Sequence, residues 1–458
     1  MSFPINGRIA IIDDQLKQVE PLIKVLSKKQ YPFSYFNGDL RYLPNEDSIF
    51  NDYRIIFLDI NLIDDREHEP KILKGRLIPV LNKIISKNNF PFVIVFWSRH
   101  KEHYKLVEEI FSTELTDRKP IGFLQQESKL DYFDFDGSEA PDLDKKVDEL
   151  FANIDKLFNN NPAFSYLLNW ENEVHKSADR TLEEIFNFEN SIENWENNAN
   201  YIFTKLGLSY SGKHYDGSKL EDKINSSYQA FNNVFLDSLE YSTNNSQVNN
   251  LAELLIDKSK INSQLVILGI NKKLLISEEY GSIEYPGEVL EYPLEEPLYK
   301  ELLNKILSLL IIKEQIKSKN NQVIDLELKK MADKEAKAIR DEIKKSWKCI
   351  IAIVTPLCDF VQKENKKYNR IVKGVLIKSI YKQFIDDKSE AIFISPSFLF
   401  EHESYILILD FRYFYTDNFD SRPKLQPIFR LRQQILSEIQ SKLARHISRQ
   451  GILFLDIN

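Results

Sequence analysis

Three acidic residues directly follow apolar runs near the start of the chain. Asp13 and Asp14 come after residues 9–12, and Asp59 comes after residues 55–58. Such runs are typical of strands buried in a parallel sheet, so each acid should lie at the carboxyl end of its strand. Neighbouring strands would bring the carboxylates together at the edge where open α/β sheets bind ligands. Because these carboxylates repel one another without a cation and offer hard oxygen ligands, the sequence predicts a magnesium site.

Two further residues could act at the same edge of the sheet. Ser98 ends the largely apolar run 90–98, so we expect its hydroxyl to lie nearer Asp59 than any other hydroxyl of the first domain. Lys129 comes several residues after the run 120–124. Only a loop that folds back would bring its ammonium group to the acids.

The order of these groups has a parallel in a known family. An acid pair, a central aspartate, a hydroxyl and a lysine at successive strand ends resemble the receiver domain of two-component response regulators, over about residues 5–157. Residues 59–62 are similar to the family's phosphoacceptor motif, and Asp13 and Asp14 are similar to its metal-binding pair.

The resemblance implies a phosphoryl-transfer chemistry. Asp59 would be the nucleophile that takes a phosphoryl group from a histidine kinase or a small phosphodonor. Asp13, Asp14 and Asp59 would bind Mg²⁺, and the backbone carbonyl of Asn61 would be a further ligand.

The same resemblance gives roles to the two other groups. Ser98 would form a hydrogen bond with the phosphoryl group, and Lys129 would neutralise its charge. The aspartyl phosphate would add charge at the sheet edge and bias contacts with a C-terminal output module. The protein would then be a bacterial signalling phosphoprotein.

Three features depart from the family pattern. Ile63 stands where a proline is usual, residues 64–74 look like an insertion before a third helix over 75–86, and Gln126 replaces an aromatic residue. These departures leave open an alternative, in which the domain is a receiver-like scaffold that binds proteins without being phosphorylated.

The 458 residues are too many for one compact core, and three domains are predicted. Alternating strands and helices over 1–160 indicate a doubly wound, parallel, receiver-like sheet. Residues 161–345 have helical periodicity, including one helix over 299–316. Residues 346–458 read as an α+β domain. The predicted fold class is therefore α/β, with an α-helical middle region and a C-terminal α+β domain.

The helical region offers little chemistry. His175 and His214 have acids close by in sequence, but ordinary surface histidines explain them better than a metal or a general base. The helix over 326–347 is mostly charged, which favours a solvated helix or one that bridges domains. Residues 280–292 contain two glycines and a proline and should form a loop or a small hairpin.

The C-terminal region contains two features that could be functional. Cys358 and Asp359 follow a buried strand over 349–354, so an effector enzyme of a stress or defence operon with a nucleophile there is a second alternative. A final helix over 428–448, before a last strand over 451–456, is rich in basic residues that could bind a phosphate or nucleic-acid backbone. These basic residues are Lys424, Arg430, Arg432, Lys442, Arg445 and Arg449.

Composition places the protein in the cytoplasm. Two cysteines exclude a disulfide scaffold, and the formal net charge of −8 gives no overall support for nucleic-acid binding. The first residues lack the basic and apolar segments of a signal peptide, and the longest apolar run, near 306–312, is too short to span a bilayer. We therefore expect no membrane partner.

Overall fold

The computed structural model describes most of the chain. The described residues are 3–4, 6–45, 52–64, 66–125, 128–132, 140–187, 194–211, 220–245, 264–278, 285–292, 296–319, 324–361, 368–418 and 425–448. Several predictions of the sequence analysis fall outside this part of the chain. They concern Gln126, His214, Lys424, Arg449, the strand over 451–456 and the side chain of Cys358.

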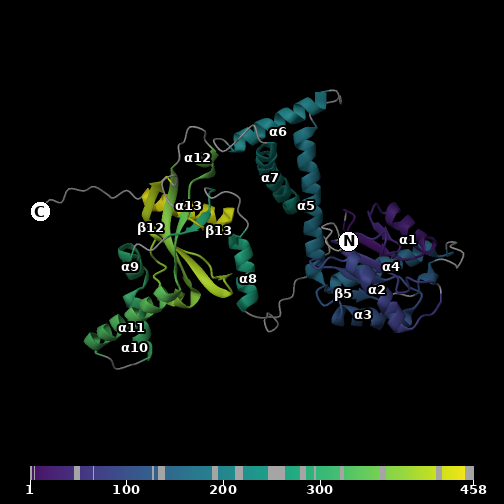
Figure 1. The fold of residues 1–458 in the computed structure, drawn as a ribbon, viewed down its shortest axis with the longest axis horizontal. Coiled ribbons are helices and arrows are strands. Elements are labelled where there is room, and N and C mark those ends of the chain that lie inside the picture. The colour runs from purple at the N-terminus through teal and green to yellow at the C-terminus, as the bar shows by residue number, and fades with distance from the viewer. Residues whose placement is uncertain are drawn as a thin grey trace. The chain divides into compact units, whose positions relative to one another are not determined.

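The chain separates into two compact units (Figure 1). One comprises Met1–Ala199 and Phe231–Ile256, and the other comprises Asn200–Ala230 and Asp257–Asn458. The predicted fold class is confirmed, because a parallel five-stranded sheet, a helical middle region and an antiparallel sheet with helices follow one another along the chain. Among the described residues, no helix is long and apolar enough to cross a membrane.

The N-terminal sheet has five parallel strands in the order β2-β1-β3-β4-β5. Its strands are β1 (Ile9–Ile12), β2 (Ser34–Phe36), β3 (Ile55–Leu58), β4 (Val93–Phe96) and β5 (Gly122–Leu124). All residues of β1, β3 and β4 are buried, as their uninterrupted apolar sequences predicted. The central position of β1 and β3 makes their carboxyl ends neighbours.

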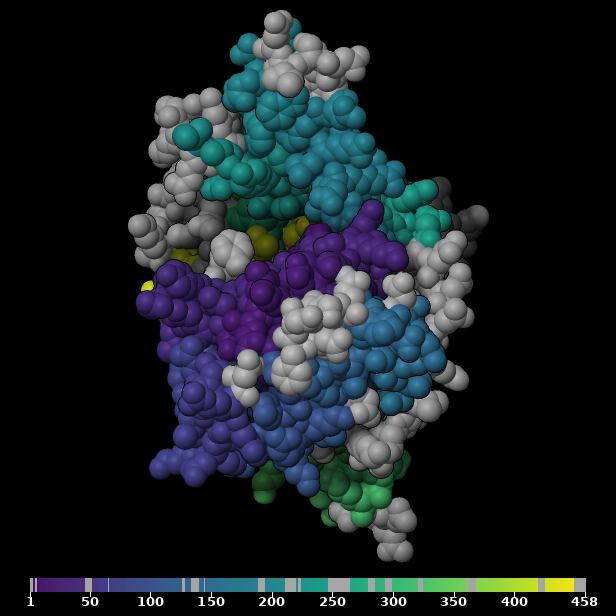
Figure 2. All heavy atoms as spheres, turned by 90° about the vertical axis from the view of Figure 1, so that its right-hand side faces the viewer, coloured from purple at the N-terminus to yellow at the C-terminus, as the bar shows by residue number. Residues whose placement is uncertain are grey.

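Helices cover both faces of this sheet. They are α1 (Leu16–Lys28), α2 (Pro70–Ile84), α3 (Tyr104–Thr113) and α4 (Leu143–Asn160). Alternate strand residues point to opposite faces. Ile12 and Leu58 therefore share a core with α2 and α3, whereas Ile11 and Phe57 share one with α1 and α4. In Figure 2 the purple and blue segments of this unit form one continuous surface.

The insertion before α2 is shorter than predicted. This helix begins at Pro70 rather than at Gly75, because proline fits the first turn of a helix, where its missing N–H group is not needed. Residues 70–74 are therefore helical.

The helical middle region begins with α5 (Pro162–Phe186), which packs its first turns against the core beneath α1 and α4 through Phe164 and Leu168. It continues with α6 (Trp195–Ser211) and α7 (Leu220–Asn245). Glu171 of α5 forms ion pairs with Arg54 at 3.0 Å and with Arg8 at 3.2 Å. These arginines precede β3 and β1, so α5 is tied to the amino-terminal edge of the sheet.

The C-terminal unit is built on an antiparallel sheet in the order β10-β12-β9-β8-β7-β13-β6, with β11 paired to β12. Its strands are β6 (Ile276–Ser277), β7 (Glu288–Glu291), β8 (Lys348–Ile353), β9 (Asn369–Lys378), β10 (Ile392–Ile394), β11 (Phe398–Phe400), β12 (Glu403–Asp417) and β13 (Pro427–Leu431). The segment 280–292, predicted as a loop or hairpin, thus contributes β7, which lies between β8 and β13. Its Val289 and Leu290 are fully buried, one on each face of the sheet.

Helices pack on both faces of this second sheet. They are α8 (Gln264–Leu275), α9 (Glu296–Ile306), α10 (Leu309–Lys319), α11 (Asp325–Ser346), the short α12 (Leu357–Val361) and α13 (Gln433–Ile447). The single helix predicted over 299–316 is interrupted, because Leu307 pairs with Ile385 in an isolated bridge.

The charged helix α11 is not solvated on every side. Leu328, Ala332, Ala336, Ile339 and Ile343 form a buried stripe in one core with α9 and α10. Small alanine side chains allow close packing, so the stripe needs few large apolar residues and its high charge concealed it in the sequence.

The predicted C-terminal helix is divided into a strand and a helix. Pro427–Leu431 forms β13, and α13 begins only at Gln433. Arg430 therefore lies in a strand, with its guanidinium over the ring of Tyr285, and Arg432 donates to the carbonyl of Ile276 at 3.2 Å. Only Lys442 and Arg445 of the described basic residues lie on the helix.

Candidate metal centre

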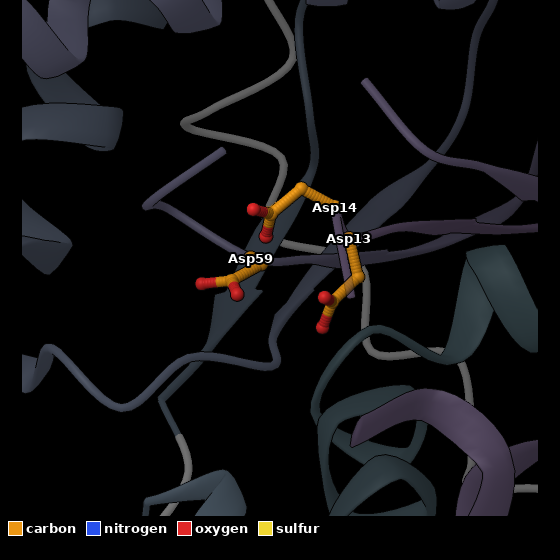
Figure 3. Close-up of side chains that lie close together, drawn as sticks. All are labelled: Asp13, Asp14 and Asp59. Carbon is orange, nitrogen blue, oxygen red and sulfur yellow. The ribbon is translucent and has the colours of Figure 1, made fainter. Parts of the chain in front are cut away.

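The three acids converge as predicted. Asp13, Asp14 and Asp59 each offer a carboxylate oxygen, and these oxygens lie within 4.8 Å of one another (Figure 3). Strand register explains the convergence, because Ile12 of β1 is paired with Leu58 of β3 and the amide of Asp59 donates to the carbonyl of Ile12 at 2.8 Å. Asp13 and Asp59 are buried, whereas Asp14 is partly exposed.

Lys129 reaches this cluster through the folded-back loop that its late position required. Its backbone amide donates to the carbonyl of Ser98 at 3.2 Å, and the Ser128 hydroxyl accepts from the amide of Leu130 and caps the short 3₁₀ helix Lys129–Asp131. The ammonium group donates to Asp13 Oδ2 at 2.9 Å and also to Asp59 Oδ2. With 2% of its surface exposed, it is a buried cation between two buried carboxylates.

Burial and repulsion set the proton affinity of the cluster. Burial, together with the charge of Asp59, raises the pKa of Asp13 to about 7, against the opposing effect of Lys129. Burial alone would lower the pKa of Lys129, but the carboxylates of Asp59 and Asp13 raise it. Burial and the charges of Asp13 and Asp14 also raise the pKa of Tyr35 to about 12. The site therefore holds excess negative charge that a divalent cation would neutralise.

This pKa predicts how stability depends on pH. Asp13 binds a proton more tightly in the folded than in the unfolded protein, so its contribution to stability is lost as pH rises from about 4 to about 7. Without divalent cations, we expect Asp13→Asn to gain stability over the wild type as the pH rises. The free energy of unfolding of Asp13→Asn minus that of the wild type should be about 1–3 kcal/mol larger at pH 8 than at pH 4. Urea denaturation of both proteins at each pH measures this difference. An equal difference at both pH values would show that the pKa of Asp13 is not raised.

Ser98 and Asn61 lie at the same edge of the sheet. Ser98 is fully buried two residues after the end of β4, and its hydroxyl accepts from the amide of His100 at 3.3 Å. The Asn61 amide N–H donates to Asp59 Oδ1 at 3.2 Å, and the Asn61 side chain donates to the carbonyls of Asp64 and Arg66 at 2.7 Å each. Asn61 thus shapes the loop after β3 that carries Ile63 in place of proline.

Asp59 lines a small cleft that was predicted only in part from the sequence. Besides Asp59, Asn61 and Lys129, its lining residues are Gln15, Gln18, Asp64, Arg99 and His100. Gln15 directly follows Asp14, and Arg99 and His100 directly follow Ser98, whereas Gln18 lies on α1 and Asp64 lies in the loop after β3. A position just beyond a strand end was the signal that could have identified Gln15, Arg99 and His100, but polar residues there are also common in turns.

The other candidate residues do not assemble into a site in the described part of the chain. His175 lies partly buried on α5 and belongs to no group of potential metal ligands there. Asp359 forms an ion pair with Arg370 at 2.7 Å. Burial raises the pKa of the Cys349 thiol to about 12, which makes that cysteine a poor nucleophile. Arg430 and Arg432 are engaged within the C-terminal unit and do not extend a basic surface of α13.

The fold and site define a class of domain: an open parallel α/β sheet with an acidic cluster at the carboxyl ends of its central strands. This arrangement is compatible with a receiver-like fold. Comparison with known proteins adds no relative, because no family model, no curated protein and no solved structure matches the chain.

Proposed function

We propose that the N-terminal domain is a magnesium-dependent phosphoacceptor that takes a phosphoryl group on Asp59 and thereby regulates the rest of the chain. One observation carries the proposal: three carboxylates from adjacent strand ends converge beside a buried lysine. The acidic cluster and the lysine beside it support the receiver resemblance.

The reaction follows from these positions. A carboxylate oxygen of Asp59 attacks the phosphorus atom of a histidine-kinase phosphohistidine or of a small acyl phosphate. The bond from phosphorus to the leaving atom breaks, and the leaving group departs with its electron pair. Asp13, Asp14, Asp59 and the carbonyl of Asn61 would hold Mg²⁺, which when bound offsets the charge of the phosphoryl oxygens.

Other groups of the cleft would stabilise the product. Lys129 lies beside Asp59 and can turn from the carboxylate to a phosphoryl oxygen. The Ser98 hydroxyl can donate to a second oxygen. The cationic side chain of Arg99 lines the same cleft, which favours an anionic donor.

Incubation with acetyl phosphate and Mg²⁺ tests this function. We expect the wild type to gain the mass of one phosphoryl group, and the gain should disappear with EDTA or in Asp59→Asn. Asp39→Asn is the matched control, because Asp39 is an acid of the same unit that pairs with exposed Arg41. If Asp59→Asn gains the same mass as the wild type, Asp59 is not the acceptor.

One observation favours the second candidate, a phosphorylation-independent scaffold. Lys129 already neutralises part of the charge on Asp13 and Asp59, so the fold has a cation between these acids without a metal. A scaffold of this kind would show neither a mass gain nor a rise in melting temperature with millimolar Mg²⁺. A phosphoacceptor would show both.

A further inference from the structure

Gln18 is a buried polar residue of α1 that faces the cleft beside Asp59 and has no role in the proposed reaction. Only 4% of its surface is exposed, and it lines the cleft together with Asp59, Asn61 and Lys129. Its side-chain amide donates to Oε1 of Gln15. Among the described residues, its Oε1 atom is buried without a hydrogen-bond partner.

This unsatisfied oxygen points to a ligand. A buried amide carbonyl without a donor destabilises the folded protein, and native proteins rarely leave one in place. Reversing the Gln18 amide alone does not remove the problem, because it would set Oε1 of Gln18 against Oε1 of Gln15. The missing partner must therefore be an O–H or N–H donor that enters the cleft.

The neighbouring groups indicate which donor it is. The ammonium of Lys129 is directed to Asp13 and Asp59, so it satisfies carboxylates rather than Gln18. Mg²⁺ bound by carboxylates usually keeps several of its waters, and the charge of the ion makes these waters strong donors. A hydrated ion at Asp13, Asp14 and Asp59 would thus bring O–H groups into the cleft that Gln18 lines.

We infer that Gln18 is a positioning residue for the metal: its Oε1 accepts a hydrogen bond from a water molecule bound to the ion. The inference rests on the metal site of the proposed function and adds that this site prefers one metal ion over another. Ca²⁺ binds six to eight oxygen ligands in flexible geometry and depends less on one ordered water than Mg²⁺ does. Gln18 therefore favours Mg²⁺ over Ca²⁺.

Metal titrations of the full-length protein test this inference. Gln18→Met keeps the volume of the side chain but removes the acceptor, so it should weaken Mg²⁺ binding about tenfold and Ca²⁺ binding about twofold or less. Gln18→Glu retains an acceptor oxygen and should bind Mg²⁺ at least as tightly as the wild type. Gln433→Met, at an exposed glutamine of α13, is the control and should change neither affinity.

The outcomes separate this inference from the proposed function. Equal Mg²⁺ affinity of Gln18→Met and the wild type overturns the role of Gln18 and leaves the metal site intact. A wild type that binds no Mg²⁺ overturns both. If Gln18→Met does not fold, the alternative test follows the NMR resonances of the Gln18 side-chain amide in the wild type. They should shift on Mg²⁺ addition, and unchanged resonances at saturating Mg²⁺ would overturn the inference.

Discussion

At about pH 9, where Asp13 is ionised, Lys129→Met should lower the free energy of unfolding by about 3–5 kcal/mol when no divalent cation is present. The ammonium of Lys129 is buried between Asp13 and Asp59, and its removal leaves two buried carboxylates facing each other without a cation. Millimolar Mg²⁺ should restore much of the loss, because an ion that binds only the folded state stabilises it. Urea denaturation with Mg²⁺ or EDTA measures both effects.

Lys74→Met is the control for this experiment. Lys74 belongs to the same unit, and its ion pairs with Glu109 and Glu114 lie at the surface, where such pairs contribute little. Its replacement should leave both unfolding curves nearly unchanged. A loss below about 1 kcal/mol in Lys129→Met would mean that Asp13 takes up a proton when the lysine is absent.

Glu171→Ala should destabilise the N-terminal unit by about 2–4 kcal/mol. Glu171 accepts from both Nε and one terminal amine of Arg54, at 3.0 and 3.1 Å, and pairs with Arg8 at 3.2 Å. Only 16% of its side chain is exposed, so its removal leaves two partly buried guanidinium groups without this carboxylate. The midpoint of chemical unfolding, followed by a probe in the N-terminal unit, measures the loss.

Glu184→Ala provides a comparison on the same helix. Glu184 pairs with Arg180 one turn away, and both side chains are about half exposed, so the substitution should have little effect. Equal destabilisation by the two substitutions would show that α5 contributes only its helical propensity and is not anchored to the sheet through Glu171.

Short-range patterns in the sequence were sufficient for the N-terminal fold. A strand buried on both faces must be apolar at every position, and a carboxylate that follows it must leave the core. For this reason β1, β3, Asp13 and Asp59 could be located by inspection. Parallel pairing of neighbouring strands then brings the acids together, whatever the loops between them contain.

The sequence was less informative where long-range packing decides the structure. The charge of α11 concealed its buried alanine stripe, and β7 is a strand only because β8 and β13 provide hydrogen-bonding partners on both sides. The division between β13 and α13 likewise depends on pairing with β6 and β7. Helical periodicity alone cannot represent such contacts, since it reports only neighbours along the chain.

The candidate site shows the same division. Its carboxylates follow from their places at strand ends, so the sequence by itself determined that acids would gather at one edge of the sheet. Only the tertiary structure decided that Lys129 reaches them, because a hydrogen bond to the Ser98 carbonyl and a cap from Ser128 turn its loop inward. Likewise, the burial of Gln18 beside Asp59 depends on how α1 packs against the sheet, a contact between segments far apart in the chain.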